Sequence, residues 1–181
     1  MTGTFTNNWH GLKNAMLLGG YYQNGFSTVY NTNGQRLNGQ DSSYSSRRLA
    51  SLISLINNAY TTINDRISVR LGTSDTTPLA SDYNLGTPWS SNISYVSASA
   101  TTPSFDSTTH KVSRTYTLTI QNTAAATTTV REFGLFTVLS ATTNSGDVML
   151  YRGILEEPVT LRQYESATIE FTIEMTLDDP F

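Results

Sequence analysis

The sequence predicts a mainly β protein, a β-sandwich of about seven to eight antiparallel strands preceded by one helix and an extended N-terminal arm. Three observations indicate this class. Ser and Thr supply 50 of the 181 residues while charged residues make up only 14%, a composition that argues against a helical bundle or coiled coil. Apolar and polar residues alternate with a period of two through the second half of the chain. Turn-rich loops separate these runs about every ten residues.

Residues 1–45 differ from the rest of the chain and are interpreted as the arm. Seven of the 12 glycines fall in the first 39 residues, where Asn-Gly turns alternate with large aromatic side chains. A loosely ordered terminus is one interpretation. The many aromatic residues favour a second interpretation, an arm that lies on a neighbouring subunit. Disordered tails contain few aromatic residues, and large aromatic side chains bury well against a surface. The predicted assembly contacts are Phe5, Trp9, Tyr21, Tyr22, Phe26 and Tyr30.

Residues 46–63 are predicted to form the helix. Leucine and isoleucine recur there at spacings of three and four, which places them on one apolar stripe. Ser45 or Ser46 can cap the start. We expect the stripe to pack against a sheet; the alternative is a partner helix in an oligomer.

Residues 64–181 are predicted to be the sandwich domain. The clearest strand covers 111–121, where Val, Arg, Tyr, Leu and Ile alternate with Ser and Thr, so one face is buried and the other is a threonine ladder. Gly134 indicates a bulge or a close approach within a strand. A loop over 72–88 holds two prolines and two glycines. The strands are expected over 67–71, 93–100, 111–121, 130–139, 148–155, 158–161 and 167–177.

Charge and composition exclude several classes of partner. The formal net charge is −3 and no basic run occurs, so we expect no nucleic acid binding by phosphate neutralisation. No apolar run approaches the roughly 18 residues that span a bilayer, so no membrane association is expected. The chain has no cysteine, which excludes a disulfide framework. No basic segment precedes the short apolar run at 15–18, so we expect no signal peptide and synthesis in a cytoplasm.

No pattern of catalytic residues is found. His10 and His110 are the two histidines that could act as a base, but no serine of the sequence lies in a Gly-x-Ser-x-Gly element. Both histidines are expected at the surface. Glu170 and Glu174 share the polar face of one strand. We expect both side chains to be solvated; a catalytic pair of carboxylic acids is the alternative. Weak Ca²⁺ binding by Asp75 and Asp82 in the 72–86 loop is a metal alternative, although the spacing matches no EF-hand, and Asp178-Asp179 is a lesser one. We therefore predict a protein that is not an enzyme, with no catalytic residues, cofactor or metal.

Two further features suggest structural or binding roles. Arg131 and Glu132 are adjacent in a strand and point to opposite faces, so one of them can be buried. We expect a brace between the sheet and the 72–86 loop that involves Asp82, Tyr83, Arg131 and Glu132, with Arg131 paired to Asp82; a solvated pair is the alternative. Trp89 follows a proline at a loop-to-strand junction. It is expected either to close one end of the sandwich or to stack on a sugar, as a glycan-binding module would use Trp89 and Tyr83.

Five segments carry a resemblance to a known class. Residues 70–85, RLGTSDTTPLASDYNL, resemble a loop of small structural proteins encoded by tailed bacteriophages, of the form LGTG, then Pro, then Asp-Tyr. Segments 114–120, 129–136, 150–161 and 165–173 are similar to consecutive strands of the same proteins. The resemblance covers about 60% of the chain, from Ile67 to Leu177. The sequence departs from the pattern at Ser74 and Tyr164, where the family has glycine, and the arm has no counterpart.

The resemblance implies a virion component made in the host cytoplasm: a head accessory or decoration protein, a head fibre or a tail-associated protein. The partners implied are copies of itself and other virion proteins of the capsid or tail. We expect a homo-oligomer that assembles through the arm and the helix. A glycan-binding or adhesive β-sandwich module is the alternative.

Overall fold

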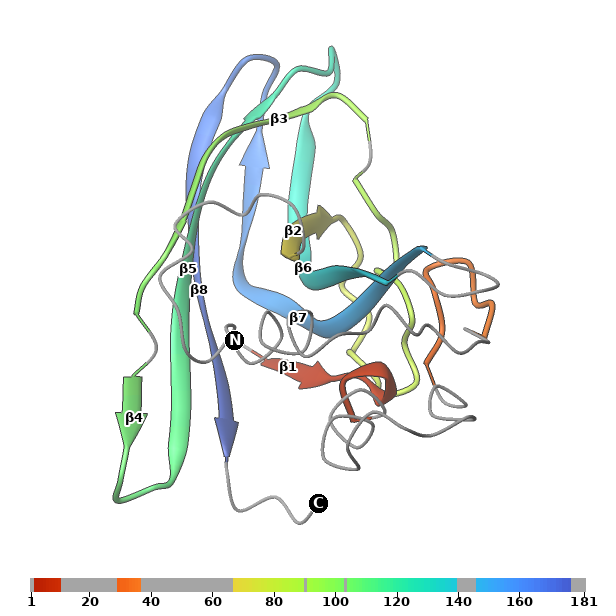
Figure 1. Cartoon of the computed structure of the whole chain (residues 1–181). Coiled ribbons are helices and arrows are strands. Elements are labelled where there is room, and N and C mark those ends of the chain that lie inside the picture. The colour runs from red at the N-terminus through yellow and green to blue at the C-terminus, as the bar shows by residue number, and fades with distance from the viewer. Residues whose placement is uncertain are drawn as a thin grey trace. The chain divides into compact units, whose positions relative to one another are not determined.

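The computed structural model describes residues 2–10, 29–36, 67–89, 91–102, 104–139 and 146–176. Within these ranges eight strands form two antiparallel sheets (Figure 1). The predicted fold class, mainly β with about eight strands, is confirmed. The helix predicted over 46–63 lies outside the described residues, as do Tyr21, Tyr22 and Phe26. The chain divides into two compact units.

The first unit contains residues 1–45, 64–91 and 129–160. Its sheet has the strand order β1 (Thr2–Phe5), β7 (Gly146–Leu161), β6 (Thr128–Leu139), β2 (Ile67–Gly72). β1 runs antiparallel to β7, and β2 runs antiparallel to β6. The first strand of the chain therefore lies at one edge of this sheet, next to the strand formed near residue 150.

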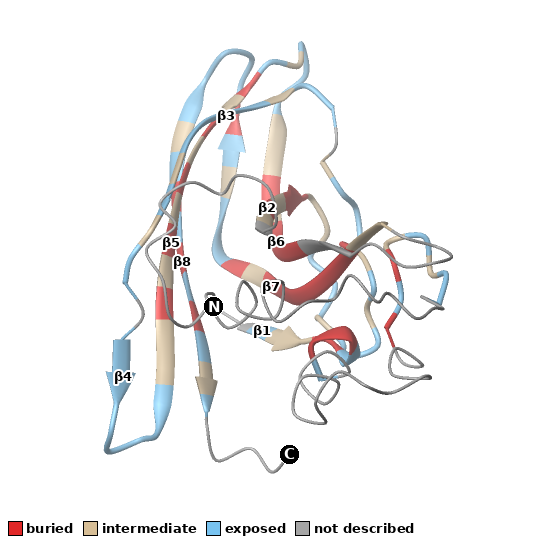
Figure 2. Cartoon of the chain, in the orientation of Figure 1, coloured by how far each residue is buried: buried red, intermediate tan, exposed pale blue. Residues whose placement is uncertain are grey.

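The core of the first unit lies on the two central strands. Residues 132–136 of β6 and 148–153 of β7 are all buried (Figure 2), which explains their nearly continuous apolar sequence. Gly134 marks a close approach, because a Cβ there would lie 2.7 Å from the Phe136 ring and 2.9 Å from the Leu85 side chain. The register with β2 is unbroken at this point, so Gly134 is not a bulge.

β7 is longer than the sequence indicated. Two separate strands were expected over 148–155 and 158–161, and this expectation is wrong, since one strand continues from Gly146 to Leu161. Pro158 removes a hydrogen-bond donor but leaves extended backbone accessible. The Thr129 and Thr160 hydroxyls lie 3.0 Å apart, which joins the start of β6 to the end of β7.

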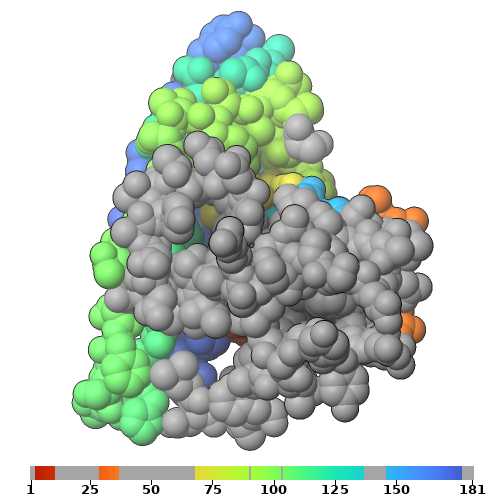
Figure 3. All heavy atoms as spheres, viewed as in Figure 1, coloured from red at the N-terminus to blue at the C-terminus, as the bar shows by residue number. Residues whose placement is uncertain are grey.

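The second unit contains residues 46–63, 92–128 and 161–181. Its central strand is β5 (Lys111–Asn122). β3 (Ile93–Ala100) and β4 (Ser104–Asp106) pair with successive parts of β5, and β8 (Ser166–Thr176) also pairs with β5. The side chains of residues 92–102 and 104–106 are mostly exposed, and their green spheres form part of the visible surface in Figure 3.

The alternation predicted for β5 is confirmed. Tyr116, Leu118 and Ile120 are buried, while the threonines between them are only partly covered. Tyr116 stacks on Phe171 of β8 with ring centroids 5.4 Å apart. Burial raises the pKa of the Tyr116 hydroxyl, and the nearby charge of Arg114 offsets this only in part. One face of this sheet is thus apolar and the other is a ladder of hydroxyls.

The hairpin between β4 and β5 depends on the carboxylate of Asp106. The Thr109 hydroxyl and the Thr108 amide donate to it at 2.7 and 2.8 Å, and His110 then takes a φ of +51°. The hydrogen bond from the Thr109 side chain, followed by those from the two backbone amides, lowers the pKa of Asp106 below its ordinary 3.8.

Asp106→Asn is expected to destabilise the protein slightly at neutral pH and not in strong acid. Because the pKa of Asp106 is lowered by folding, its contribution is present above the unfolded-state pKa and is lost as the pH falls through the folded-state value. Urea unfolding of both proteins at neutral pH and well below pH 3.8 measures the difference. A difference that stays constant across this range would contradict the assignment.

Tyr164, in the turn between β7 and β8, has a φ of +61° and a side chain that is 68% exposed. This left-handed conformation costs a residue with a Cβ about 1–2 kcal/mol, and the exposed ring contributes little packing. Tyr164→Gly is therefore expected to raise the free energy of unfolding by about 1 kcal/mol. Tyr164→Ala removes the ring but keeps the Cβ, so it should give no gain. Thermal unfolding that ranks Ala equal to or above Gly would refute this explanation.

The described parts of the predicted arm belong to the first unit. The Thr6 amide donates to the Leu150 carbonyl at 3.0 Å. The Phe5 ring lies 5.3 Å from Trp9 and 5.0 Å from Tyr151 of β7, and Trp9 is only 7% exposed. Phe5 and Trp9 thus pack against the chain's own sheet, and their predicted contact with a neighbouring subunit stays a prediction.

A second part of the arm, residues 29–36, is tied to the first by Asn8. The buried Asn8 side chain donates to the Tyr30 carbonyl at 2.9 Å and accepts from the Tyr30 amide at 2.7 Å. Asn31 forms the following turn by accepting from the Asn33 and Gln35 amides. The Tyr30 side chain itself is 40% exposed, so of the predicted contact residues that are described it alone presents a large exposed surface.

Candidate functional site: a buried ion network beneath the 72–89 loop

The loop between β2 and residue 89 is held closed at its base. The Thr73 amide donates to the Thr87 carbonyl, and the Trp89 amide donates to the Leu71 carbonyl, each at 2.9 Å. Gly72 and Pro88 face each other in an isolated antiparallel bridge. Prolines, glycines and short polar residues between these points explain the absence of regular structure. The loop therefore leaves the sheet and returns to the same place.

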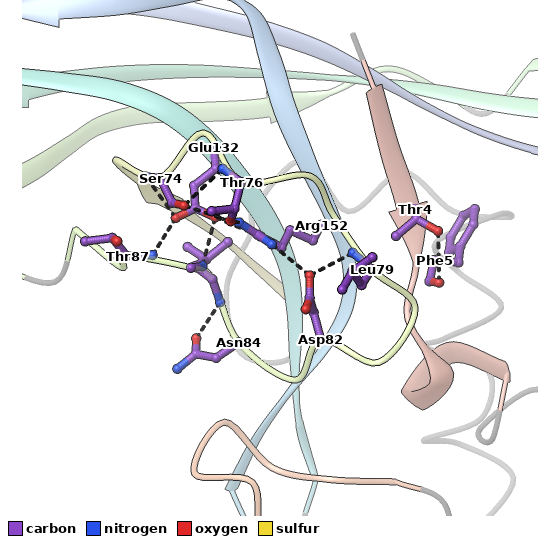
Figure 4. A network of polar contacts seen from close by, with 12 residues as sticks. Thr4, Phe5, Ser74, Thr76, Leu79, Asp82, Asn84, Thr87, Glu132 and Arg152 are labelled. Atoms are coloured by element: carbon purple, nitrogen blue, oxygen red, sulfur yellow. Dashed lines mark hydrogen bonds and ion pairs between the residues drawn. The ribbon is translucent and has the colours of Figure 1, made fainter.

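Glu132 of β6 is the buried anion at the centre of this loop. Its side chain is fully buried, and the loop backbone converges on it: the amides of Thr87, Gly86 and Ser74 donate to its carboxylate at 2.8, 3.0 and 3.3 Å (Figure 4). Arg152 donates to the Oε2 atom of the same group at 2.8 Å. A buried carboxylate needs such partners because its unpaired form costs several kcal/mol.

Arg152 of β7 links this carboxylate to the far side of the loop. Its side chain is only 3% exposed. Nη1 donates to Asp82 at 2.7 Å, Nη2 donates to the Thr76 hydroxyl at 2.8 Å, and Asp82 in turn accepts from the Leu79 amide at 2.9 Å. Burial by itself would lower the pKa of Arg152, but the hydrogen bonds and charges of Asp82 and Glu132 outweigh it and raise the pKa, so the guanidinium stays charged.

This network is saturated within the chain. Among the described residues, no buried side-chain nitrogen or oxygen lacks a hydrogen-bond partner. The two carboxylates share one guanidinium, and each also accepts a backbone amide of the loop. In the same part of the chain, no group of three or more His, Asp or Glu residues could hold a metal ion. The arrangement can therefore fix the position of the loop.

The predicted brace is correct in two of its residues and wrong in its pairing. Asp82 and Glu132 both belong to the network, but Asp82 pairs with Arg152 instead of Arg131. Arg131 and Glu132 do lie on opposite faces of β6: Glu132 takes the buried one and Arg131 is half-buried. Arg152 carried the same signal, a charged residue inside an apolar run of a strand, and the sequence interpretation missed it.

Tyr83 has a different role from the predicted one. Its ring is 46% exposed and lies 3.1 Å from the point where a Cβ on Gly34 would stand. The Asn84 side chain donates to the Thr32 carbonyl at 3.2 Å. The loop thus packs against the 29–36 segment of the first unit, and it presents Tyr83 and Leu79 (57% exposed) to solvent. Trp89, expected either to close one end of the sandwich or to stack on a sugar, is half-buried.

The remaining candidate residues lie at the surface. His10 and His110 are exposed. Glu170 and Glu174 are exposed on the polar face of β8, and Glu174 forms an ion pair with Lys111 at 3.2 Å. These placements agree with the expectation that all four side chains are exposed to solvent.

Comparison with known proteins gives no match among family models, curated proteins or solved structures. No helix within the described ranges is both long and apolar enough to cross a membrane. The geometry of the site and the resemblance of its loop are therefore the grounds for a functional conclusion.

Proposed function

We propose that the protein is a structural component of a tailed-phage virion, a head accessory or decoration protein, a head fibre or a tail-associated protein, and that it acts by assembly with copies of itself and with other virion proteins. A head-surface location is favoured within this class. The proposal assigns no catalytic step to the chain.

The observation that carries the proposal is the use made of the buried charges. Glu132, Arg152 and Asp82 each bond to partners within the chain. They hold in one position the loop whose sequence carries the family resemblance. A rigid loop with exposed apolar tips suits a protein that works through contact area.

The location of the exposed aromatics modifies how assembly is expected to occur. The arm was proposed as the contact with neighbours, but Phe5 and Trp9 are used inside the chain. Among the described residues of the first unit, Leu79 and Tyr83 of the loop and Tyr30 of the neighbouring turn are the large exposed apolar side chains that can take that role. Because the ion network fixes the loop, little conformational entropy is lost when it binds.

Quantitative mass spectrometry of density-purified particles tests the proposal. The protein is expected in the particle fraction, at a copy number that is a small multiple of a symmetric capsid or tail component. Particles carrying Leu79→Ser and Tyr83→Ser should incorporate less of it, whereas Val96→Ser, at an exposed position of β3, is the matched control. A protein that is abundant in the lysate and absent from particles would reject the virion role.

A glycan-binding module is the second candidate, and the fixed, half-exposed ring of Tyr83 favours it. Sugars stack on such rings when the ring is held in place. A glycan array with the purified chain should then give a signal that Tyr83→Ala removes, with Trp89→Ala as a second variant. An array without any signal leaves the virion component as the sole proposal.

A further inference from the structure

β8 is a long strand with one open edge. It pairs with β5 over Ser166–Thr176 in a continuous register without a bulge, and no strand among the described residues pairs with its other edge. Proteins commonly block such an edge with a lysine, a proline or a bulge. The sequence SATIEFTIEMT has none of these devices. Within the part of the chain that the structure describes, this leaves a regular edge of 11 residues without a paired strand, which is the geometry that strand addition uses.

The direction in which each β8 residue points its backbone hydrogen-bonding groups follows from the pairing just before the strand begins. The Asn122 amide donates to the Glu165 carbonyl at 3.0 Å, which makes residues 122 and 165 a hydrogen-bonded pair. Because such pairs recur every second residue, the odd-numbered residues of β8 bond to β5. The even-numbered residues direct their amides and carbonyls to the open edge, and their side chains are all exposed: Ser166, Thr168, Glu170, Thr172, Glu174 and Thr176.

We propose that a second copy of this chain adds its own β8 to this edge, antiparallel and about a twofold axis that passes beside Phe171. The register follows from the charges that each symmetric pairing would bring together. A symmetric pairing centred on Glu170 sets this carboxylate against its own copy. One centred on Thr172 sets Glu170 against Glu174 twice. Like charges directly opposite each other are destabilising.

The register centred on Phe171 avoids these contacts and pairs the whole strand. It places Glu170 opposite Thr172 of the second copy, and Thr168 opposite Glu174. On the other face the two Phe171 side chains meet at the axis, and Ile169 meets Ile173. In each copy Thr172 already shares a hydrogen bond with Thr115 at 2.8 Å, so across the axis a hydroxyl would face the carboxylate of Glu170 of the second copy, which can accept a hydrogen bond from it.

The open edge of β2 does not fit β8. The Leu71 carbonyl accepts from Trp89, on the side away from β6, so the odd residues of β2 face outward. Val69 and Leu71, the outward residues, carry buried side chains, whereas the outward residues of β8 carry exposed ones. If the two edges paired, the buried face of β2 would continue into the exposed face of β8 on the same side of the joined sheet. The self-pairing of β8 has no such conflict.

Charge variants at Thr172 test the pairing in the purified full chain. The wild type is expected to form dimers by sedimentation velocity. Thr172→Lys places a cation opposite Glu170 of the second copy at two symmetric positions, and Thr172→Glu places an anion there, so their dimer dissociation constants should differ by about tenfold or more, with Lys tighter. Thr115→Lys and Thr115→Glu are matched controls. Thr115 lies directly opposite Thr172, on the central strand, and these two variants should dimerise alike.

Cysteine cross-linking tests the register, since the natural chain has no cysteine. Glu170→Cys mixed with Thr172→Cys should form a disulfide-linked heterodimer, because directly opposite residues suit disulfide geometry. Either variant alone should cross-link poorly. A monomeric wild type at its highest soluble concentration, or efficient cross-linking by one variant alone, would overturn the proposal. The proposed pairing rests on the proposed function, because it describes how the virion protein contacts a second copy of itself. If the pairing is refuted, the particle-incorporation experiment still tests the virion role independently.

Discussion

Arg152→Met is expected to lower the free energy of unfolding by about 3–5 kcal/mol, because it leaves the buried carboxylate of Glu132 without its cation. The methionine fills most of the volume, so the loss comes from the uncompensated charge and the broken contacts to Asp82 and Thr76. Urea unfolding measures the change. Hydrogen exchange at the Gly86 and Thr87 amides, which donate to Glu132, reports whether the loop opens first.

Arg131→Met is the matched control for this prediction. Arg131 is the half-buried arginine next to Glu132, on the opposite face of the same strand, and surface substitutions of this kind usually change stability by less than about 0.5 kcal/mol. If the two variants were equally stable, the ion network would contribute nothing to the fold. The conclusion that it holds the loop would then be lost.

Trp9→Ala is expected to cost about 3–5 kcal/mol, the range for a large aromatic removed from a core. Trp9 is 7% exposed and packs against Phe5, which lies on Tyr151 of β7. Tyr30→Ala is the control, since that side chain is 40% exposed. Chemical unfolding of the purified chain at low concentration measures both. A Trp9→Ala variant as stable as the wild type would restore the interpretation that this residue serves a neighbouring subunit.

Strands with a clean alternation were predictable from the sequence, and those whose pairing depends on distant residues were not. β5 was predicted to within a residue because its apolar face reads directly from Val112 to Ile120. β1 was missed, since Thr2–Phe5 has one apolar side chain and is a strand only because β7 is beside it. β7 was divided in two at Pro158, although its neighbour β6 supports it beyond that point.

The buried network was predictable in part for the same reason. Adjacent opposite charges inside a strand pointed to Glu132, and the loop pattern pointed to Asp82. The choice between Arg131 and Arg152 as the cation depended on which strand lies beneath the loop, and this is a property of the strand order. Local sequence identifies residues that need a partner, whereas the topology decides which partner they obtain.

The position of β1 at the edge beside β7 has a consequence for synthesis. Thr6 bonds to the Leu150 carbonyl, 144 residues further along the chain, so the first strand has no place to dock until most of the polypeptide has left the ribosome. At about 5–20 residues per second this wait lasts from several seconds to about half a minute. The early aromatic residues remain uncovered during that interval, and completion of this sheet is expected to be among the last events in biogenesis.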